Sequence, residues 1–275
     1  DLQIPGLATS AWIDVIRRAV VHASKISDQR MHDPEINKDW QLLHRFEYNH
    51  FYNAWVGVAF RLRACAIHSE DYTTLFQRTR GATQDEDRYQ EDDALFGFFV
   101  KGLSALESFY YSMYAFGALI VTSTQEPSVP PAPQFHLLTH VVDPAHRKVS
   151  PEFIKPNTTH DAYTKVFPEL PITEHLGRIR EDERYKEWST IRNILAHRVA
   201  AAGRTMQYPF GFPLNEPPLS VKLWGMDLTL DAQTTASRYT WLRETINTAL
   251  EETALFAAQQ LPYTEDELDQ WTIRP

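Results

Sequence analysis

The sequence predicts an all-α protein, in which long amphipathic helices pack together as a bundle. Apolar residues recur at three- and four-residue steps along four long stretches and along a shorter one near the start, the spacing that places them on one face of a helix. All 17 prolines lie outside these stretches. Strands are expected to be incidental to this architecture.

Composition and charge limit the classes of protein to which the chain can belong. The chain has 275 residues, of which 43% are hydrophobic, as in an ordinary soluble core. Its single cysteine, Cys65, cannot form an internal disulfide and is predicted to be buried in a reducing, cytoplasmic protein. No stretch reaches the roughly 20 apolar residues of a membrane helix. The net charge of -9 argues against broad nucleic-acid binding, although a local basic site remains open.

Two helices are expected in the first quarter of the chain. The first runs from Ser10 to Ser27, with Ser10 as its N-cap. The second runs from about 40 to 68 and carries an apolar stripe of Phe51, Trp55, Val58, Leu62 and Cys65. The opposite face is expected to be solvated and carries Arg45, Arg61 and Arg63.

A third helix, from about 94 to 121, is the most apolar and is predicted to be the central core helix. The acidic run before it, between 81 and 93, is predicted to be solvated and to cap that helix with its last carboxylates. Its acidic residues lack the ordered spacing of a calcium loop, so no metal site is predicted there. Three tyrosines of the helix are expected to be core or half-buried residues: Tyr110, Tyr111 and Tyr114.

Prolines break the helical pattern from 123 to 172, which is predicted to be a long irregular insertion beside the bundle. His136 and His140 are four residues apart, which raises the alternative of a zinc site and a metal-dependent hydrolase. No cysteine or acidic residue completes a recognisable ligand set, and Phe135 indicates a short packed element instead. The sequence therefore predicts no metal and no cofactor.

The last two bundle helices are expected over 173 to 198, capped by Thr173, and over 235 to 260, beginning at Thr234 or Thr235. Between them lies a second insertion, at about 199 to 234.

That insertion is expected to contain a short hairpin across Gly225, between 220 and 230. After the last bundle helix, Thr264 and Glu267 have the spacing of a capping box.

Positive charge gathers at the end of the fourth helix on a chain that is acidic overall. Between positions 184 and 204 the charged residues are five basic and one acidic: Arg184, Lys186, Glu187, Arg192, Arg198 and Arg204. Such a local patch can attract a phosphate group even where the whole surface repels a polyanion.

Within this patch stands the hexapeptide Arg192-Asn193-Ile194-Leu195-Ala196-His197, an arginine, a polar residue, and a histidine after four intervening residues. It resembles the signature of the HEPN superfamily of helical-bundle proteins. The aromatic-rich stretch from Leu103 to Phe109 is similar to an earlier helix of that bundle. The resemblance covers the bundle helices and implies a single HEPN-like domain over 1–275, with four core helices, an added N-terminal helix and the two insertions.

The resemblance also implies a function, because HEPN proteins include metal-independent endoribonucleases of stress-response, toxin and phage-defence systems. By this resemblance the chain is a homodimer that cleaves RNA and leaves 2′,3′-cyclic phosphate ends. Arg192 holds the scissile phosphate, Asn193 orients the phosphate or the histidine, and His197 is the general acid or base. The expected substrate contacts are Lys186, Arg198 and Arg204.

An antitoxin is a further expected partner under this resemblance. Toxins of the group that pair with nucleotidyltransferase antitoxins carry a tyrosine two residues after the histidine. This chain has Val199 there, so modification of such a tyrosine is not expected.

The alternative is a non-catalytic interaction or ligand-binding protein, since other HEPN members bind or assemble without catalysis. In that case Arg192 pairs with a bundle carboxylate such as Glu107, and a cationic His197 favours the negative end of its helix. Positions five apart on a helix are about 140° out of phase, so Arg192 and His197 do not share a face, whereas Asn193 and His197 do.

Overall fold

The computed structural model confirms the all-α prediction. It describes residues 7–31, 38–79, 85–124, 135, 154–197, 204–207, 220–223 and 227–270. Its helices are α1 (Thr9–Met31), α2 (Lys38–Thr79), α3 (Asp85–Thr124), α4 (Pro156–Val166), α5 (Pro171–Glu181), α6 (Glu183–His197), α7 (Ala232–Gln260) and α8 (Glu265–Asp269). Two short strands, β1 (Arg204–Gln207) and β2 (Ser220–Leu223), form an antiparallel pair. None of the helices in the described ranges is long and apolar enough to cross a membrane.

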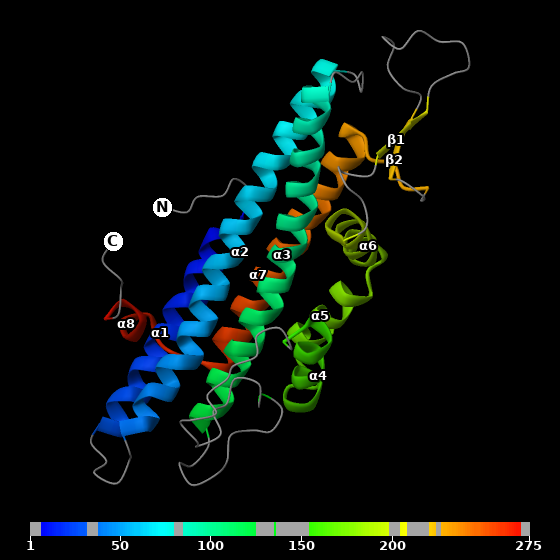
Figure 1. Cartoon of the computed structure of the whole chain (residues 1–275). Coiled ribbons are helices and arrows are strands. Elements are labelled where there is room, and N and C mark those ends of the chain that lie inside the picture. The colour runs from blue at the N-terminus through cyan, green and yellow to red at the C-terminus, as the bar shows by residue number, and fades with distance from the viewer. Residues whose placement is uncertain are drawn as a thin grey trace.

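Helices α2 and α3 form a long antiparallel hairpin along the whole bundle (Figure 1). Both are longer than predicted, and α3 begins at Asp85 rather than at 94. The reason is contact with the end of α2, where Arg78 pairs with Asp87 at 2.6 Å and the Thr79 hydroxyl donates to Glu91. Most of the acidic run is therefore the first turns of α3 instead of a solvated cap, and Glu91 is only 1% exposed.

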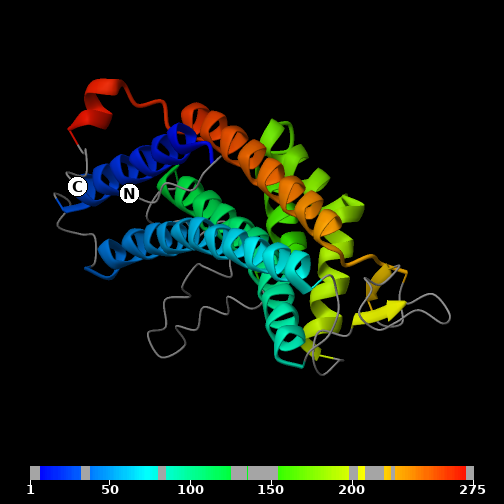
Figure 2. The ribbon, with the colours of Figure 1, turned by 90° about the horizontal axis from the view of Figure 1, so that it is seen from above.

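The core forms where α1 and α7 pack against this hairpin (Figure 2). Trp12 of α1 stacks on Trp55 of α2, with ring centroids 4.8 Å apart. Residues 112–120 of α3 are all buried, which confirms it as the central core helix. Cys65 is also buried, as predicted. Helix α1 begins at Thr9, so Ser10 lies inside the helix and is not its N-cap.

The predicted helix over 173 to 198 is two helices, α5 and α6, separated at Asp182. Asp182 has an extended backbone, and its two carboxylate oxygens accept hydrogen bonds from the Arg184 backbone N–H (2.7 Å) and from Trp241 Nε1 of α7 (3.2 Å). An aspartate that captures nearby N–H groups in this way ends one helix and begins the next. Thr173 is not a cap, because its hydroxyl donates to the Phe167 carbonyl.

Part of the predicted irregular insertion is helical. Helix α4 begins with Pro156 at its first turn, a position where the missing proline N–H costs no hydrogen bond. It is fixed to α3 by Thr159, whose hydroxyl donates to the Tyr110 carbonyl at 3.1 Å, and by Tyr163, whose hydroxyl donates to the Met113 carbonyl at 2.8 Å.

Phe135, in the same insertion, is buried and packs between aromatic rings of α3 and α4. This agrees with a short packed element at that point. His136 and His140 lie outside the described residues.

The second insertion contains more pairing than the sequence indicated. Lys222 forms an antiparallel bridge with Thr229, as expected for a hairpin across Gly225, and β2 pairs on its other side with β1, which was not predicted. Helix α7 then begins with a capping box of Asp231 and Thr234, so Asp231 is the N-cap rather than either threonine.

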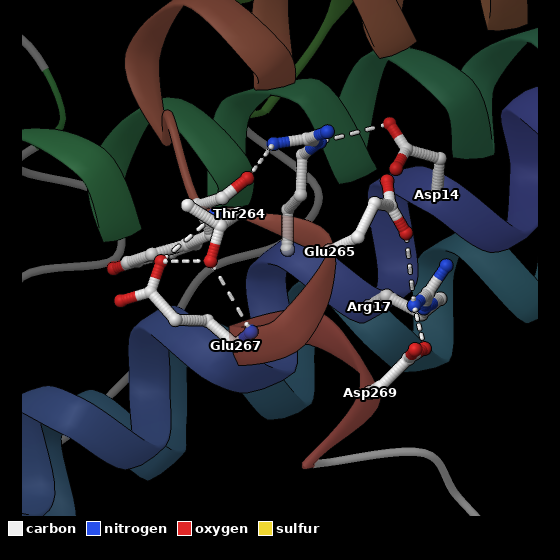
Figure 3. Close-up of polar contacts among 8 residues, drawn as sticks. Asp14, Arg17, Thr264, Glu265, Glu267 and Asp269 are labelled. Atoms are coloured by element: carbon white, nitrogen blue, oxygen red, sulfur yellow. Dashed lines mark hydrogen bonds and ion pairs between the residues drawn. The ribbon is translucent and has the colours of Figure 1, made fainter.

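The short helix α8 returns the chain to α1 (Figure 3). The capping box of Thr264 and Glu267 is confirmed. Arg17 of α1 pairs with Asp269 at 2.7 Å and with Glu265 at 3.4 Å. Lys25, two turns further along α1, pairs with Glu267. These ion pairs fix the C-terminal end of the described chain on the bundle.

Candidate functional site

A polar cleft of about 700 Å³ opens between α2, α3, the beginning of α4 and α6. We call it the Arg192 cleft. Most of its lining residues have polar side chains, and the full set is His50, Asn53, Ala54, Arg61, Ser104, Glu107, Ser108, Tyr111, Ile154, Lys155, Pro156, Tyr185 and Arg192. Pockets of this size bind small molecules.

Arg192 is held in the wall of this cleft by an ion pair. Its Nη2 atom lies 2.6 Å from Glu107 Oε1 of α3, the carboxylate that the non-catalytic alternative gave as an example of its partner. The Arg192 side chain remains 27% exposed. A guanidinium has five N–H donors, so a contact through one nitrogen leaves others available to a ligand.

Two further cations line the cleft, Arg61 and Lys155. Neither makes a side-chain hydrogen bond or ion pair within the described part of the chain. Arg61 was predicted to be solvated, yet it is only partly exposed. Gly57, one turn earlier on α2, explains its position, because a Cβ atom there would lie 2.4 Å from Arg61 Nη1. The guanidinium therefore lies across the helix surface at Gly57.

Two tyrosines bring hydroxyl groups to the cleft. The Tyr111 hydroxyl lies 2.6 Å from His50 Nδ1, which ties α3 to α2. Burial raises the pKa of Tyr111 to about 12. Burial, and secondly the nearby charge of Glu107, raise the pKa of Tyr185 to about 12 as well. Both phenols are therefore protonated at neutral pH. The Tyr111 hydroxyl is engaged by His50, and the Tyr185 O–H can act as a neutral donor.

The cleft carries positive charge on an acidic chain. Its lining residues include three cations and one carboxylate: Arg61, Lys155 and Arg192, and Glu107. The whole chain has a formal charge of -9. A concave surface with one sign of charge concentrates the electrostatic field and raises the local concentration of a small counter-ion.

The predicted site residues are not all brought together. Arg192 lines the cleft, whereas Asn193 is exposed and is not among the lining residues. Lys186 is also outside the lining, and its ammonium group pairs with Glu183 at 2.6 Å. His197 ends α6 and Arg204 begins β1, but their side chains, like all of Arg198, lie outside the described structure.

Sequence reasoning missed the other walls of the cleft. On α2 the signal was His50, Asn53, Ala54, Gly57 and Arg61, which are polar or small and follow three- and four-residue steps.

On α3 the corresponding set is Ser104, Glu107, Ser108 and Tyr111. Two such faces on consecutive antiparallel helices indicate a polar groove, although either face alone is typical of a solvated surface.

The structure tests the prediction of no metal site, and the zinc alternative, only in part. Within the described ranges, no group of three or more His, Cys, Asp or Glu side chains is arranged to hold a metal ion. The histidine pair of the zinc alternative, His136 and His140, lies outside those ranges.

No family model matches this chain, and neither a curated protein nor a solved structure does. The residues of the cleft are therefore the basis for a functional proposal.

Proposed function

We propose that the chain binds a small phosphate-bearing ligand in the Arg192 cleft. The supporting observation is the pair of cations, Arg61 and Lys155, that line the cleft and have no carboxylate partner among the described residues. Arginine matches the geometry of phosphate oxygens and forms strong charge-assisted hydrogen bonds with them. Arg192, oriented by Glu107, supplies a third cation, and the Tyr185 hydroxyl supplies a neutral donor.

A small ligand fits this site better than a long polyanion. The net charge of -9 repels an extended nucleic-acid backbone, which requires a broad basic footprint. A single phosphate group meets only the local field of the three cations.

Replacing Arg61 with glutamine is expected to weaken binding of phosphate compounds by roughly tenfold or more, because a hydrogen bond to a charged group contributes about 1.5–3 kcal/mol. The measurement is titration calorimetry of the wild-type chain and Arg61→Gln with pyrophosphate and adenosine monophosphate.

The matched control is Arg63→Gln, on the same helix. Arg63 is exposed and does not line the cleft. This control should bind like the wild type. Equal losses in the two variants, or no binding of either compound by the wild type, would contradict the proposal.

The second candidate function is the metal-independent, HEPN-type endoribonuclease of stress response or phage defence, acting as a homodimer. The observation that favours it is the position of Arg192, the arginine of the sequence signature, in a cleft with two further cations. In this form of the proposal Arg192 holds the scissile phosphate of RNA through the donors that Glu107 does not occupy. His197 exchanges the proton, and the partner is a second copy of the chain, with an antitoxin as a further partner.

If this function is correct, the wild-type chain should cleave a mixed RNA substrate in EDTA and leave 2′,3′-cyclic phosphate ends. Arg192→Gln and His197→Ala should each lose about a hundredfold or more of that rate, the usual cost of removing an electrostatic or acid–base group. The readout is end-group chemistry of the RNA fragments, at matched folding and oligomeric state. Absence of cleavage by the wild type across several RNAs would leave the ligand-binding function alone.

A further inference from the structure

One carboxylate oxygen in the Arg192 cleft has no hydrogen-bond donor. Glu107 Oε1 accepts from Arg192 Nη2, but Glu107 Oε2 accepts no hydrogen bond within the described part of the chain. The Glu107 side chain is 43% exposed, and solvent reaches Oε2. An ionised carboxylate can only accept hydrogen bonds, so a ligand that lies beside Glu107 gains by bringing a donor group to it.

The Arg61 guanidinium lies on the same part of the cleft wall as Glu107. A Cβ atom at Gly57 would lie 2.4 Å from Arg61 Nη1 and 3.9 Å from Ser108 Oγ, so these two groups approach the same point. Ser108 follows Glu107 in the sequence of α3, and both residues line the cleft. A small molecule whose phosphate group binds Arg61 is therefore long enough to reach Glu107.

The charges around Glu107 favour a neutral donor. A second phosphate group there would place negative charge beside the carboxylate, and like charges repel. An ammonium group would compete with the Arg192 guanidinium, which already lies 2.6 Å from Oε1, and would be repelled by the cations of the cleft. A hydroxyl group can donate to Oε2 without either cost.

Further hydroxyl groups would also find partners in this cleft. Asn53 and Ser104 line it, and neither side chain makes a hydrogen bond within the described ranges. The volume of about 700 Å³ leaves room for a ligand much larger than a phosphate group.

From these contacts we propose that the ligand of the Arg192 cleft is a sugar phosphate, an assignment that rests on the phosphate-binding function proposed above. The phosphate group binds Arg61 and Lys155. A sugar hydroxyl donates to Glu107 Oε2, and other hydroxyls bind the polar side chains of the cleft. Free sugar phosphates and nucleotides share this chemistry.

The test compares three phosphate esters by titration calorimetry of the wild-type chain. Glucose 6-phosphate carries ring hydroxyls, hexyl phosphate carries none, and 6-aminohexyl phosphate carries an ammonium group instead. Glucose 6-phosphate is expected to bind roughly tenfold or more tightly than hexyl phosphate, the usual effect of a hydrogen bond to a charged group. Adenosine monophosphate is titrated alongside, and the tighter of the two sugar-bearing compounds distinguishes a free sugar phosphate from a nucleotide.

Glu107→Gln should lower this preference to about threefold or less, because a neutral amide makes a hydrogen bond about half as strong as a charge-assisted one. The measured quantity is the ratio of the two affinities, since a general change in the fold or the field alters both alike. The amide oxygen can still accept from Arg192, so the variant should fold like the wild type. The control is Glu86→Gln on the same helix, which is exposed and outside the cleft lining and should keep the wild-type ratio.

Wild-type affinities that are equal for hexyl phosphate and both sugar-bearing compounds would overturn the sugar assignment and leave the phosphate-binding function intact. Tightest binding of 6-aminohexyl phosphate would also overturn it, and so would a preference that Glu107→Gln leaves unchanged. If the wild type binds none of these compounds, the phosphate-binding function fails together with the sugar assignment.

Discussion

Gly102→Ala is expected to destabilise the protein by about 2 kcal/mol, although alanine is the better helix former by up to about 1 kcal/mol. Gly102 lies on α3 where α6 crosses it. A Cβ atom there would lie 2.2 Å from Trp188 Cζ3 and 3.0 Å from Leu242 Cδ2. Both neighbours are fully buried, so neither can move aside without disturbing the core.

Gly97→Ala, on the same helix, is the matched control. A Cβ atom at Gly97 would approach the His68 ring at 2.5 Å, but that ring is the end of a partly exposed side chain and can rotate away. This substitution should be neutral or stabilising by up to about 1 kcal/mol. Urea denaturation of the two variants gives the comparison. Equal stabilities would show that the α3–α6 contact at Gly102 is not tightly packed.

The same contact positions the Arg192 cleft. Glu107 and Arg192 lie little more than one helical turn beyond Gly102 and Trp188, so the close approach of α3 and α6 brings the ion pair together. We therefore expect Gly102→Ala to reduce ligand binding in the cleft as well as stability.

Helical periodicity was sufficient to predict the all-α class, because it depends on each stretch alone. The errors occurred where a distant residue decides the structure. From the sequence, Asp87 and Glu91 were predicted to belong to a solvated acidic run. In the structure they are bound by Arg78 and Thr79 of the preceding helix. From the sequence, Asp182 was predicted to be an ordinary helix position. The helix break at Asp182 depends on its contact with Trp241, which is 59 residues away in the sequence.

The candidate site divides in the same way. Arg192 and its partner Glu107 were predictable, the first from a local signature and the second as a bundle carboxylate. Arg61 and Lys155 could not be predicted as site residues, because only the folded structure brings α2 and the start of α4 to the same cleft. Neither residue has a local pattern that distinguishes it from a solvated cation.

Two buried histidines are expected to make stability fall as the pH drops from about 6.5 towards 4. His22 and His175 are 8% and 6% exposed, and in the described structure neither Nε2 atom has a hydrogen-bond partner. Burial lowers the pKa of each imidazole to about 4. The unfolded chain binds these protons at a pKa of about 6.5, so it takes them up first, and its population grows as acid is added.

The loss should be about 2 kcal/mol for each histidine by pH 5. Glu267, which fixes α8 on α1 (Figure 3), does not contribute in this window. The Lys25 contact lowers its pKa to about 2, so its stabilisation is lost only as the pH falls from about 4.5 towards 2. The decline from neutral pH to pH 5 therefore reports mainly on buried histidines.

His22→Gln separates this effect from general acid destabilisation. His22 Nδ1 lies 2.7 Å from the Tyr263 hydroxyl, and a glutamine amide can replace that hydrogen bond without titrating. Urea denaturation at about pH 7.5 and pH 5 should show a loss of about 4 kcal/mol for the wild type and about half of that for the variant. A variant that loses as much as the wild type would mean that His22 is protonated in the folded protein at pH 5. Its burial beside Tyr263 would then not exclude the charge.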